Sequence, residues 1–483
     1  MKQRLLSFIH LLWIMQNRPA HIIASLLMVL SLFFGCHPRT EVIDMPQISE
    51  RGELVAITGY SPFSYFVYRG EVMGYDYELL GLLEDYLDIS VRIVLAHDFD
   101  EMIRMLEQGK GDLIAYGLTV TAERRERLAF TDPMNMTRQI LVQRRPDNWR
   151  QMMLHQIENE LIRNPLELSG KTIHVRRGSA YKERLLNLSR EIGAEIHISE
   201  AEKGVTTEQL IRKVAEKEID YTVADENIAT MQSAYYQNLD VSTAISLPQY
   251  TAWAVRPSSV LLRDTLNAWL QDARKHVDYY VIYNKYYENR RTFRLRYGSE
   301  YFPITGGNIS PYDSLLKEQS ARINWDWRLL AALVFRESRF DPYARSWAGA
   351  EGLMQLMPQT AKAFGAENPY DPIQNIIAGV RFLEWLDNYW SQEIADENQR
   401  LHFIIASYNA GQGHVQDARR LARADGADPD IWFGNVEKYM LKKSNPDYYL
   451  REEVVYGYAA GEEPVTYVQN ILNLHNHYKQ FFD

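Results

Sequence analysis

The stretch VFRESRFDPYARSWAGAEGLMQLMP, residues 334–358, decides the fold of the second half of the chain. It starts inside an apolar helical run and continues into a loop rich in Ser, Gly and Ala. Asn324 or Asp326 can cap this helix at its start. Three apolar residues share the face of Glu337, at seven, four and three positions before it: Leu330, Leu333 and Val334. The pattern predicts a helix whose last turn directs a carboxyl group towards a core.

Two features of this position disfavour the ionised form of Glu337. Burial removes water from the carboxylate, and the negative end of the helix adds a field of the same sign. We therefore expect the pKa of Glu337 to be raised, which suits a general acid that delivers a proton to a glycosidic oxygen near neutral pH. The alternative is a helix-terminal acid paired with Arg336 or Arg339.

Four motifs carry a resemblance in this half of the chain: ESRFDPYARSWAGAEGLMQLMPQTA from residue 337, DPIQNIIAGVRFL from 371, ASYNAGQG at 406–413 and EEPVTYVQNI at 462–471. Together they resemble the Slt-type lytic transglycosylases, a lysozyme-like family. The resemblance implies a mainly α lysozyme-like fold over about residues 311–483. One departure is Ala460, where the family pattern has Arg, and it leaves a local contact in doubt.

The resemblance implies a role for each matched residue. Glu337 would be the single catalytic acid and base, and five residues would contact the saccharide or support the site: Ser346, Gln355, Tyr408, Glu463 and Tyr467. The implied reaction cleaves the β-1,4 bond between N-acetylmuramic acid and N-acetylglucosamine. The muramoyl C6 hydroxyl attacks C1 and closes a 1,6-anhydro ring, so the second carboxylate of ordinary glycosidases is not needed. The alternative for GLMQLMP, residues 352–358, is a Met-rich turn that packs in the core. The alternative for Tyr408 is a position set by the reversal of the chain at the end of its helix.

The first half of the chain alternates short β-rich runs with amphipathic helices from residue 51, and the alternation restarts at KTIHVRRGSAYKERLLNL from residue 171. Such alternation predicts parallel βαβ units in two lobes. The segment GLTVTAERRERLAFTDP, residues 117–133, resembles the periplasmic solute-binding proteins for polar amino acids. The resemblance covers about residues 51–288 and implies an α/β two-lobed periplasmic-binding-protein fold.

Thr121 can cap a helix whose first turn carries Arg124, so backbone N–H groups and a guanidinium group converge where a carboxylate could bind. In the family, residues matching Thr119 and Arg124 hold an α-carboxylate, and an acid matching Asp225 receives the α-ammonium group. Tyr60 and Ser179 match two further contacts. Without the two-lobe pattern, Arg124 would more simply be a solvated residue in a capped turn.

Composition limits the classes of function. The chain has 483 residues, which is enough for two cores, and 53 basic against 63 acidic residues, a net charge of −10. Without a long basic tract, nucleic acid is not an expected partner. The one cysteine, Cys36, excludes an intrachain disulfide and a Cys-based metal site. The histidines show no metal-ligand spacing, so we expect no metal and no other cofactor.

The N-terminus resembles a lipoprotein signal. Residues 22–34 form an apolar run that is shorter than a membrane span and ends at Gly-Cys, so residues 1–36 read as a signal peptide with Cys36 as the lipidation site. Translation could start at Met1 or Met15, and the alternative is an inert cysteine in an uncleaved anchor. His37, which is not an aspartate, leads us to expect an outer-membrane lipoprotein facing the periplasm.

These readings divide the chain into a signal peptide (1–36), a linker (37–50), a solute-binding domain (51–288), a second linker (289–310) and a transglycosylase domain (311–483). The leading hypothesis is an exolytic or endolytic enzyme acting on peptidoglycan glycan strands, with a first domain that senses an amino acid or a muropeptide. The alternative is a periplasmic binding protein or murein-binding scaffold whose catalytic module is silent.

Overall fold

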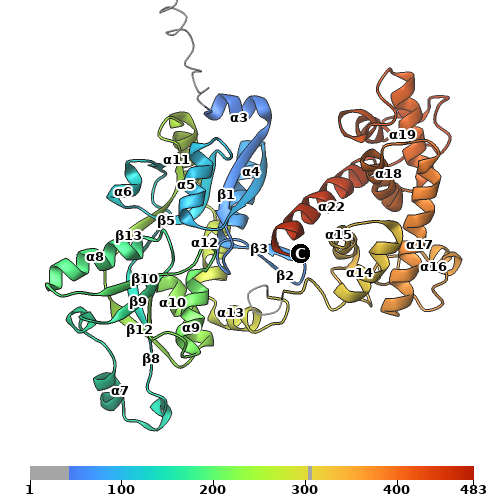
Figure 1. Cartoon of the computed structure of the whole chain (residues 1–483). Coiled ribbons are helices and arrows are strands. Elements are labelled where there is room, and N and C mark those ends of the chain that lie inside the picture. Colours follow the sequence, from blue (N-terminus) through green and yellow to red (C-terminus); the bar gives the residue numbers. More distant parts are fainter. Residues whose placement is uncertain (1–42, 303–306, 483) are drawn as a thin grey trace, which may run out of the picture.

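The computed structural model describes residues 43–302 and 307–482 (Figure 1). The predicted signal peptide and Cys36 lie outside these residues. Over the described ranges, no helix combines the length and apolar character needed to cross a membrane. The chain forms a two-lobed α/β part followed by a helical part, as the sequence predicted.

The expected linker at 37–50 is partly helical, because Met45–Arg51 form helix α3. Asp44 caps this helix and also accepts hydrogen bonds from the backbone N–H groups of Leu261 and Leu262, at 3.0 and 2.7 Å. Ile48 is fully buried. The segment before the first strand is therefore part of the first lobe.

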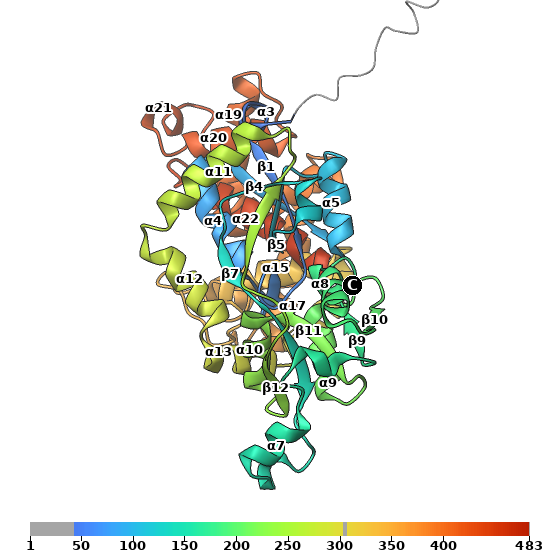
Figure 2. The ribbon, with the colours of Figure 1, turned by 90° about the vertical axis from the view of Figure 1, so that its left-hand side faces the viewer.

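The first lobe contains a six-stranded sheet covered by helices on both faces. In spatial order its main strands are β4 (Ser90–Ala96), β1 (Glu53–Gly59), β5 (Leu113–Thr119), β13 (Gln249–Val255) and β6 (Ala129–Phe130), with β7 (Asn135–Thr137) paired to β13. Its helices are α4 (Tyr75–Leu87), α5 (Phe99–Glu107), α6 (Ala122–Arg125), α11 (Val260–Ala273) and α12 (Val277–Tyr287). Along β1, Leu54 and Ala56 pack with α4 and α11, whereas Ile57 packs with α5. Figure 2 shows these helices on opposite sides of β1 and β5.

The second lobe is inserted between β7 and β13. Its five strands are, in spatial order, β10 (His197–Glu200), β9 (Thr172–Val175), β11 (Tyr221–Asp225), β8 (Gln139–Arg144) and β12 (Leu239–Ala244). The helical segments are η1 (Trp149–Gln151), α7 (Leu154–Glu160), η2 (Pro165–Leu168), α8 (Ala180–Ile192), α9 (Thr207–Ala215) and α10 (Glu226–Tyr235). Parallel pairing of β9 with β10 and β11 fits the predicted βαβ units.

The segment expected to be a linker at 289–310 begins with helix α13 (Arg290–Tyr297). Phe293 and Tyr297 are four positions apart and belong to the buried core of the first lobe, with exposures of 2% and 0%. The charged residues between them hid this helical spacing in the sequence. The structure therefore attaches the first half of this segment to the two-lobed part.

The helical part surrounds α15, whose residues 329–334 are buried. Its helical segments are α14 (Asp313–Ser320), η3 (Ala321–Ile323), α15 (Trp327–Ser338), α16 (Pro358–Ala363), α17 (Pro372–Ser391), α18 (Glu397–Ala410), α19 (Gln412–Ala424), η4 (Trp432–Val436), α20 (Glu437–Lys442), α21 (Pro446–Tyr449) and α22 (Glu462–Phe481). The long α22 packs against both α15 and α18. This packing places residues of the last helix beside the end of α15.

The two parts meet at a hairpin of strands β2 (Phe66–Tyr68) and β3 (Glu71–Met73). The hydroxyl of Tyr478 on α22 donates a hydrogen bond of 2.6 Å to the carbonyl oxygen of Gly70 at the hairpin tip. Gly70 has a φ of 78°, and a Cβ there would lie 2.6 Å from the rings of Phe335 and Phe340. The tip therefore fits against the helix that carries Glu337, as Figure 1 also shows.

Candidate active site and ligand cleft

Glu337 lies in the last turn of α15, which begins with Asp326 as its cap. Asp326 was one of the two caps predicted, and its side chain accepts a hydrogen bond from the backbone N–H of Arg328 at 2.9 Å. Arg339 and Phe340 then adopt positive φ angles of 51° and 63°, which turn the chain away from the helix axis. Glu337 is thus held at the junction between a rigid helix and the loop 341–357.

The pKa of Glu337 is raised from 4.5 to about 7, chiefly because burial disfavours the carboxylate. The hydrogen bond from the Tyr467 hydroxyl and the charge of Arg336 oppose this shift, whereas the negative charge of Glu463 adds to it. The predicted direction is confirmed. A group with this pKa can both donate and accept a proton near neutral pH.

Two of the predicted saccharide contacts also hold the loop that faces Glu337. The hydroxyl of Tyr408 on α18 donates to the carbonyl oxygen of Met354 at 2.7 Å. The side-chain amide of Gln355 donates to the carbonyl oxygens of Ala344 and Gly352, at 3.0 and 2.9 Å. The charge of Glu337 also acts on Tyr408 and raises its pKa, beyond the effect of burial. Tyr408 therefore links the loop to the surroundings of the acid.

Asn375 on α17 has a positioning role that the sequence reasoning missed. It is fully buried, its side-chain oxygen accepts from the backbone N–H of Met354 at 2.7 Å, and its amide donates to the carbonyl oxygens of Glu351 and Pro369, at 3.1 and 2.8 Å. Gly352 has a φ of 81° and a Cβ there would strike Asn375. The polar residue inside the apolar run DPIQNIIAGV was the available signal.

Ser346 and Glu463 approach the site from different elements. The Ser346 hydroxyl accepts a hydrogen bond from the backbone N–H of Ala350 at 2.9 Å and closes a tight turn in the loop. Glu463 is exposed in the first turn of α22, close enough for its charge to raise the pKa of Glu337. Tyr467 follows one helical turn later and is buried. The structure therefore brings Glu463, Tyr467 and Tyr408 together around Glu337.

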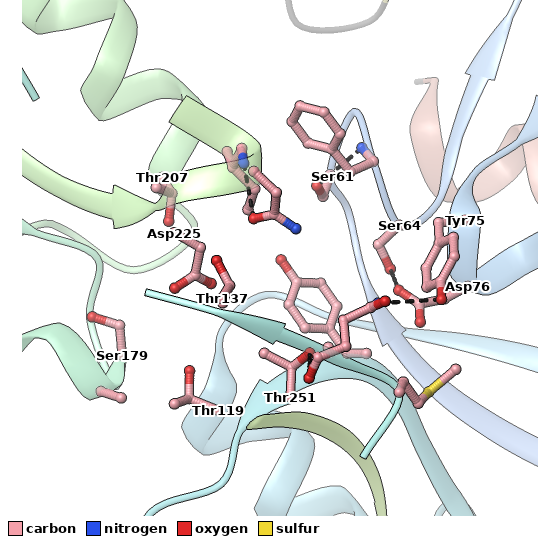
Figure 3. Close-up of a pocket in the computed structure, with 18 of the residues that line it drawn as sticks. Ser61, Ser64, Tyr75, Asp76, Thr119, Thr137, Ser179, Thr207, Asp225 and Thr251 are labelled. Atoms are coloured by element: carbon pink, nitrogen blue, oxygen red, sulfur yellow. Dashed lines mark hydrogen bonds between the residues drawn. The ribbon is translucent and has the colours of Figure 1, made fainter. Parts of the chain in front are cut away.

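A second candidate site is the cleft between the two lobes of the α/β part (Figure 3). Thr119, Thr137 and Thr251 line it from the first lobe and its connections, and Ser179 and Asp225 line it from the second. Hydrogen bonds join the lobes around it: Ser61 to Glu208 at 2.9 Å, Arg124 to the carbonyl oxygen of Gly178 at 3.1 Å and Arg176 to the Tyr116 hydroxyl at 3.0 Å. The lobes are therefore closed around a free space of about 50 Å³.

Arg124 occupies the capped turn that the sequence predicted. Thr121 accepts a hydrogen bond from the backbone N–H of Arg124 at 3.2 Å, and the guanidinium group donates to the carbonyl oxygen of Thr119 at 2.9 Å. Asp225 is the last residue of β11 on the opposite lobe, and burial raises its pKa to about 7. One of its carboxyl oxygens has no hydrogen-bond partner. Thr119, Arg124 and Asp225 thus line one cavity.

Ser179 also lines the cleft, with its hydroxyl bonded to the carbonyl oxygen of Arg176 at 2.6 Å. Tyr60 does not belong with this group. Its ring packs edge-on against Phe481 of the last helix, 5.6 Å between ring centres, and it lines a separate depression beside β4. The chain turns at Ser61, so the residue after β1 that reaches the cleft is Ser61 instead.

The sequence reasoning missed two further charged residues of the cleft. Arg176 directly follows β9 and is only 3% exposed. Asp76 accepts hydrogen bonds from Ser64 and from the indole of Trp253, both at 2.7 Å, and burial raises its pKa to about 7. An arginine directly after the apolar run of β9 was a readable signal for the first, whereas Asp76 is visible only in the fold.

Comparison with known proteins divides the chain in the same places. The family of bacterial extracellular solute-binding proteins, family 3, matches residues 54–289, and the transglycosylase SLT domain matches residues 314–431. A membrane-bound lytic murein transglycosylase F from Desulfosudis oleivorans is 33% identical over 434 residues, which cover 90% of this chain and 91% of that protein. One from Alcanivorax borkumensis is 30% identical over 454 residues, 93% of each chain.

Two solved structures are similar to about half of this chain. A mutant of ArgBP from T. maritima is 25% identical, with a TM-score of 0.42, and covers 50% of this chain and 99% of its own. An ancestral arginine-binding protein bound to arginine is 23% identical, with a TM-score of 0.42, and covers 49% of this chain and 99% of its own.

Proposed function

The chain belongs to the family of membrane-bound lytic murein transglycosylase F, and from this premise we propose that Glu337 carries out the cleavage as its single acid and base. The enzyme is a lytic transglycosylase whose C-terminal domain is of the SLT type. The proposed substrate bond is the β-1,4 linkage from N-acetylmuramic acid to N-acetylglucosamine in peptidoglycan strands. The observation that carries the proposal is the carboxyl group of Glu337, which is partly buried, accepts a hydrogen bond from Tyr467 and has a pKa of about 7.

In the first step Glu337 donates its proton to the oxygen that leaves with N-acetylglucosamine, and the bond from that oxygen to C1 breaks. Glu337 is then a carboxylate. In the second step it removes the proton of the muramoyl C6 hydroxyl while the C6 oxygen bonds to C1, which gives a 1,6-anhydro ring. The proton count balances and no water is consumed, so one acid is sufficient.

The neighbours of Glu337 support these two steps. Tyr467 stabilises the carboxylate by hydrogen bonding, so the group remains a mild acid although it is buried. Glu463 is exposed at the start of α22 and is proposed to bind the sugar or to tune Glu337 through its charge. Ser346, Gln355 and Tyr408 shape the loop, and we propose that they position the saccharide.

We further propose that the two-lobed domain binds a small ligand, an amino acid or a muropeptide, and communicates with the active site. Thr119, Arg124, Ser179 and Asp225 would form the ligand site. The route is the β2–β3 hairpin, because its tip at Gly70 contacts Phe335, which lies two residues before Glu337. A ligand that changes the position of the first lobe would move this contact.

The location is part of the proposal. The relatives are named membrane-bound, and Cys36 follows a signal-like segment. We propose lipid attachment at Cys36 and a position on the periplasmic face of the outer membrane.

Digestion of purified murein sacculi tests the enzymatic proposal. Mass spectrometry should detect muropeptides with 1,6-anhydro ends, and the chain length of early products would distinguish cutting inside strands from cutting at their ends. Glu337→Gln should release no product, whereas Glu367→Gln, which changes an exposed acid of the same domain, should leave turnover unchanged. Reducing-end products would identify a hydrolase instead. An inactive parent protein that still binds sacculi would favour a scaffold.

A further inference from the structure

The ligand cleft contains two buried guanidinium groups, those of Arg124 and Arg176. Their side chains belong to residues that are 8% and 3% exposed. Both lie over the ring of Phe99, with the guanidinium carbon 5.2 Å from the ring centre for Arg124 and 4.2 Å for Arg176. The two positive charges therefore share one wall of a small cavity.

The hydrogen bonds that these two arginines donate are all accepted by neutral groups. Arg124 donates to the carbonyl oxygens of Thr119 and Gly178, and Arg176 donates to the hydroxyl of Tyr116. The Nε atom of Arg176 is buried and has no partner. In the part of the chain that the structure describes, no carboxylate oxygen lies within 4.0 Å of either guanidinium group. The acids that act on these charges are more distant, among them Asp225 on Arg124 and Glu208 on Arg176, so each guanidinium group can still form a direct ion pair with an incoming anion.

The acids around the cleft are arranged differently. Asp225 lines it, and its Oδ1 atom is buried without a hydrogen-bond partner. Glu208 is 1% exposed and uses Oε1 to accept the hydrogen bond from Ser61 that joins the lobes, while its Oε2 has no partner. The charge of Glu208 acts on Arg176 from beyond ion-pair distance. Asp76 also lines the cleft, but Ser64 and the indole of Trp253 already donate to its two oxygens. The cleft thus offers two guanidinium groups to an anion and one carboxylate with a free oxygen, that of Asp225, to a cationic group.

We propose that the ligand is a small α-amino acid with a second acidic group on its side chain. Its α-carboxylate would bind Arg124, its α-ammonium group Asp225, and its side-chain carboxylate Arg176. This inference rests on the proposed ligand-binding role of the two-lobed domain. It adds Arg176 as the residue that selects the side chain of the ligand.

The size and charge of the cavity support this class of ligand. The free space between the closed lobes is only about 50 Å³, so this closed arrangement excludes a saccharide. A basic side chain would bring a third positive charge next to Arg176. A neutral amide could accept a hydrogen bond from Nε but would leave the charge uncompensated, whereas a carboxylate does both.

Calorimetry with the full chain tests the inference with three amino acids: L-glutamate, its isostere L-glutamine, and the basic L-arginine. Glutamate should bind about 10-fold to 100-fold more tightly than glutamine, because a hydrogen bond between charged groups is worth about 1.5–3 kcal/mol. Arg176→Gln should reduce this preference to within about threefold, and Arg176→Lys should keep part of it. Arg177→Gln is the matched control, because Arg177 is the next residue and is exposed.

Thermal unfolding of each variant shows whether it is folded, and the comparison of ligands on the unchanged chain needs no variant at all. Glutamine binding as tightly as glutamate would overturn the inference but leave the ligand-binding proposal standing. Tight binding of arginine would also overturn it and would point to Glu208 as the determinant. Binding of none of the three would overturn the inference and leave a muropeptide as the ligand class of the ligand-binding proposal.

Discussion

The hydroxyl of Tyr467 donates a hydrogen bond to Oε1 of Glu337, across 130 positions of the sequence. Tyr467 is 4% exposed and lies on α22, which packs along α15. The last helix therefore holds the side chain of Glu337 in position, although Glu337 lies much earlier in the sequence. Because the bond stabilises the carboxylate, it lowers a pKa that burial alone would raise further.

Tyr467→Phe should raise the pKa of Glu337 above its value of about 7. The first step needs the protonated acid, so activity falls as pH rises through this pKa, and the falling limb of kcat/KM against pH should move up by about one pH unit. Rates on isolated glycan strands from pH 5 to 9 would measure it. Tyr86→Phe, an exposed tyrosine of α4, is the control. If the falling limb of the pH profile stayed where it is in the parent chain, Tyr467 would only pack against Glu337 and would not tune its pKa.

Glu337→Gln should stabilise the protein at alkaline pH. The folded-state pKa of about 7 lies above the ordinary value of 4.5 for a glutamate side chain, so below pH 4.5 the group is protonated in both states and costs nothing. Between pH 4.5 and 7 the unfolded chain releases this proton while the folded state retains it, so stability falls as pH rises, and above pH 7 the penalty is constant at up to about 3 kcal/mol.

The melting temperature of Glu337→Gln should therefore exceed that of the parent chain by roughly 5 °C at pH 8, and the two should agree at pH 4.5. Scanning calorimetry at both pH values measures the difference, with Glu367→Gln as the exposed control. Equal melting temperatures at pH 8 would show that the carboxyl group of Glu337 is better solvated than its surroundings indicate.

The local sequence pattern was sufficient to predict where Glu337 and Arg124, the central residues of the two sites, lie on their helices. The helical spacing of the apolar residues before Glu337 placed it on the core-facing side of its helix, so its partial burial could be predicted. The threonine before Arg124 marked a capped turn, which placed the guanidinium group at the edge of a strand. In both cases the residues that decide the geometry lie within about seven positions of each other.

The rest depends on contacts that no local pattern contains. Tyr60 was expected in the cleft because it matches a contact of the solute-binding family, but α22 returns to this edge of the first lobe and its Phe481 packs on the tyrosine ring. Arg176 reaches the cleft only because the lobes close, which brings it to Tyr116 of the other lobe. These positions are set by packing between segments far apart in sequence.

Gly70→Ala should weaken the contact between the two parts of the molecule. Its Cβ would lie 2.6 Å from the rings of Phe335 and Phe340, and its φ of 78° is strained for alanine. Gly52→Ala is the matched control, since Gly52 has a φ of 70° and open space around it, so it carries the strain without the clash. Gly70→Ala should cost about 1–3 kcal/mol more stability than Gly52→Ala.

Activity on sacculi with each glycine variant gives the second readout for the hairpin. Because the tip contacts the helix of Glu337, Gly70→Ala should change kcat at least severalfold, whereas Gly52→Ala should not. If both variants retained the parent kcat while only stability fell, the hairpin would be a structural contact and the proposed route of communication would be wrong.

The fully buried ion pair of Lys443 and Asp417 should be the most sensitive electrostatic contact of the helical part. Both residues are 0% exposed, with Nζ and Oδ2 2.7 Å apart, and Asp417 also accepts the backbone N–H groups of Val455 and Tyr456, both at 2.9 Å. Asp417→Ala would leave a buried ammonium group and two backbone donors without this acceptor. We expect a loss of about 3–5 kcal/mol.

Asp147→Ala is the matched control, because Asp147 pairs with Lys217 at 2.6 Å on the surface, where the side chains are 78% and 57% exposed. It should change the stability very little, since water screens such pairs. Denaturant unfolding followed by tryptophan fluorescence measures both. The double change Asp417→Leu with Lys443→Met should recover part of the loss, because it removes both charges together. A loss no larger than that of Asp147→Ala would show that water reaches the pair and that its burial does not determine its energy.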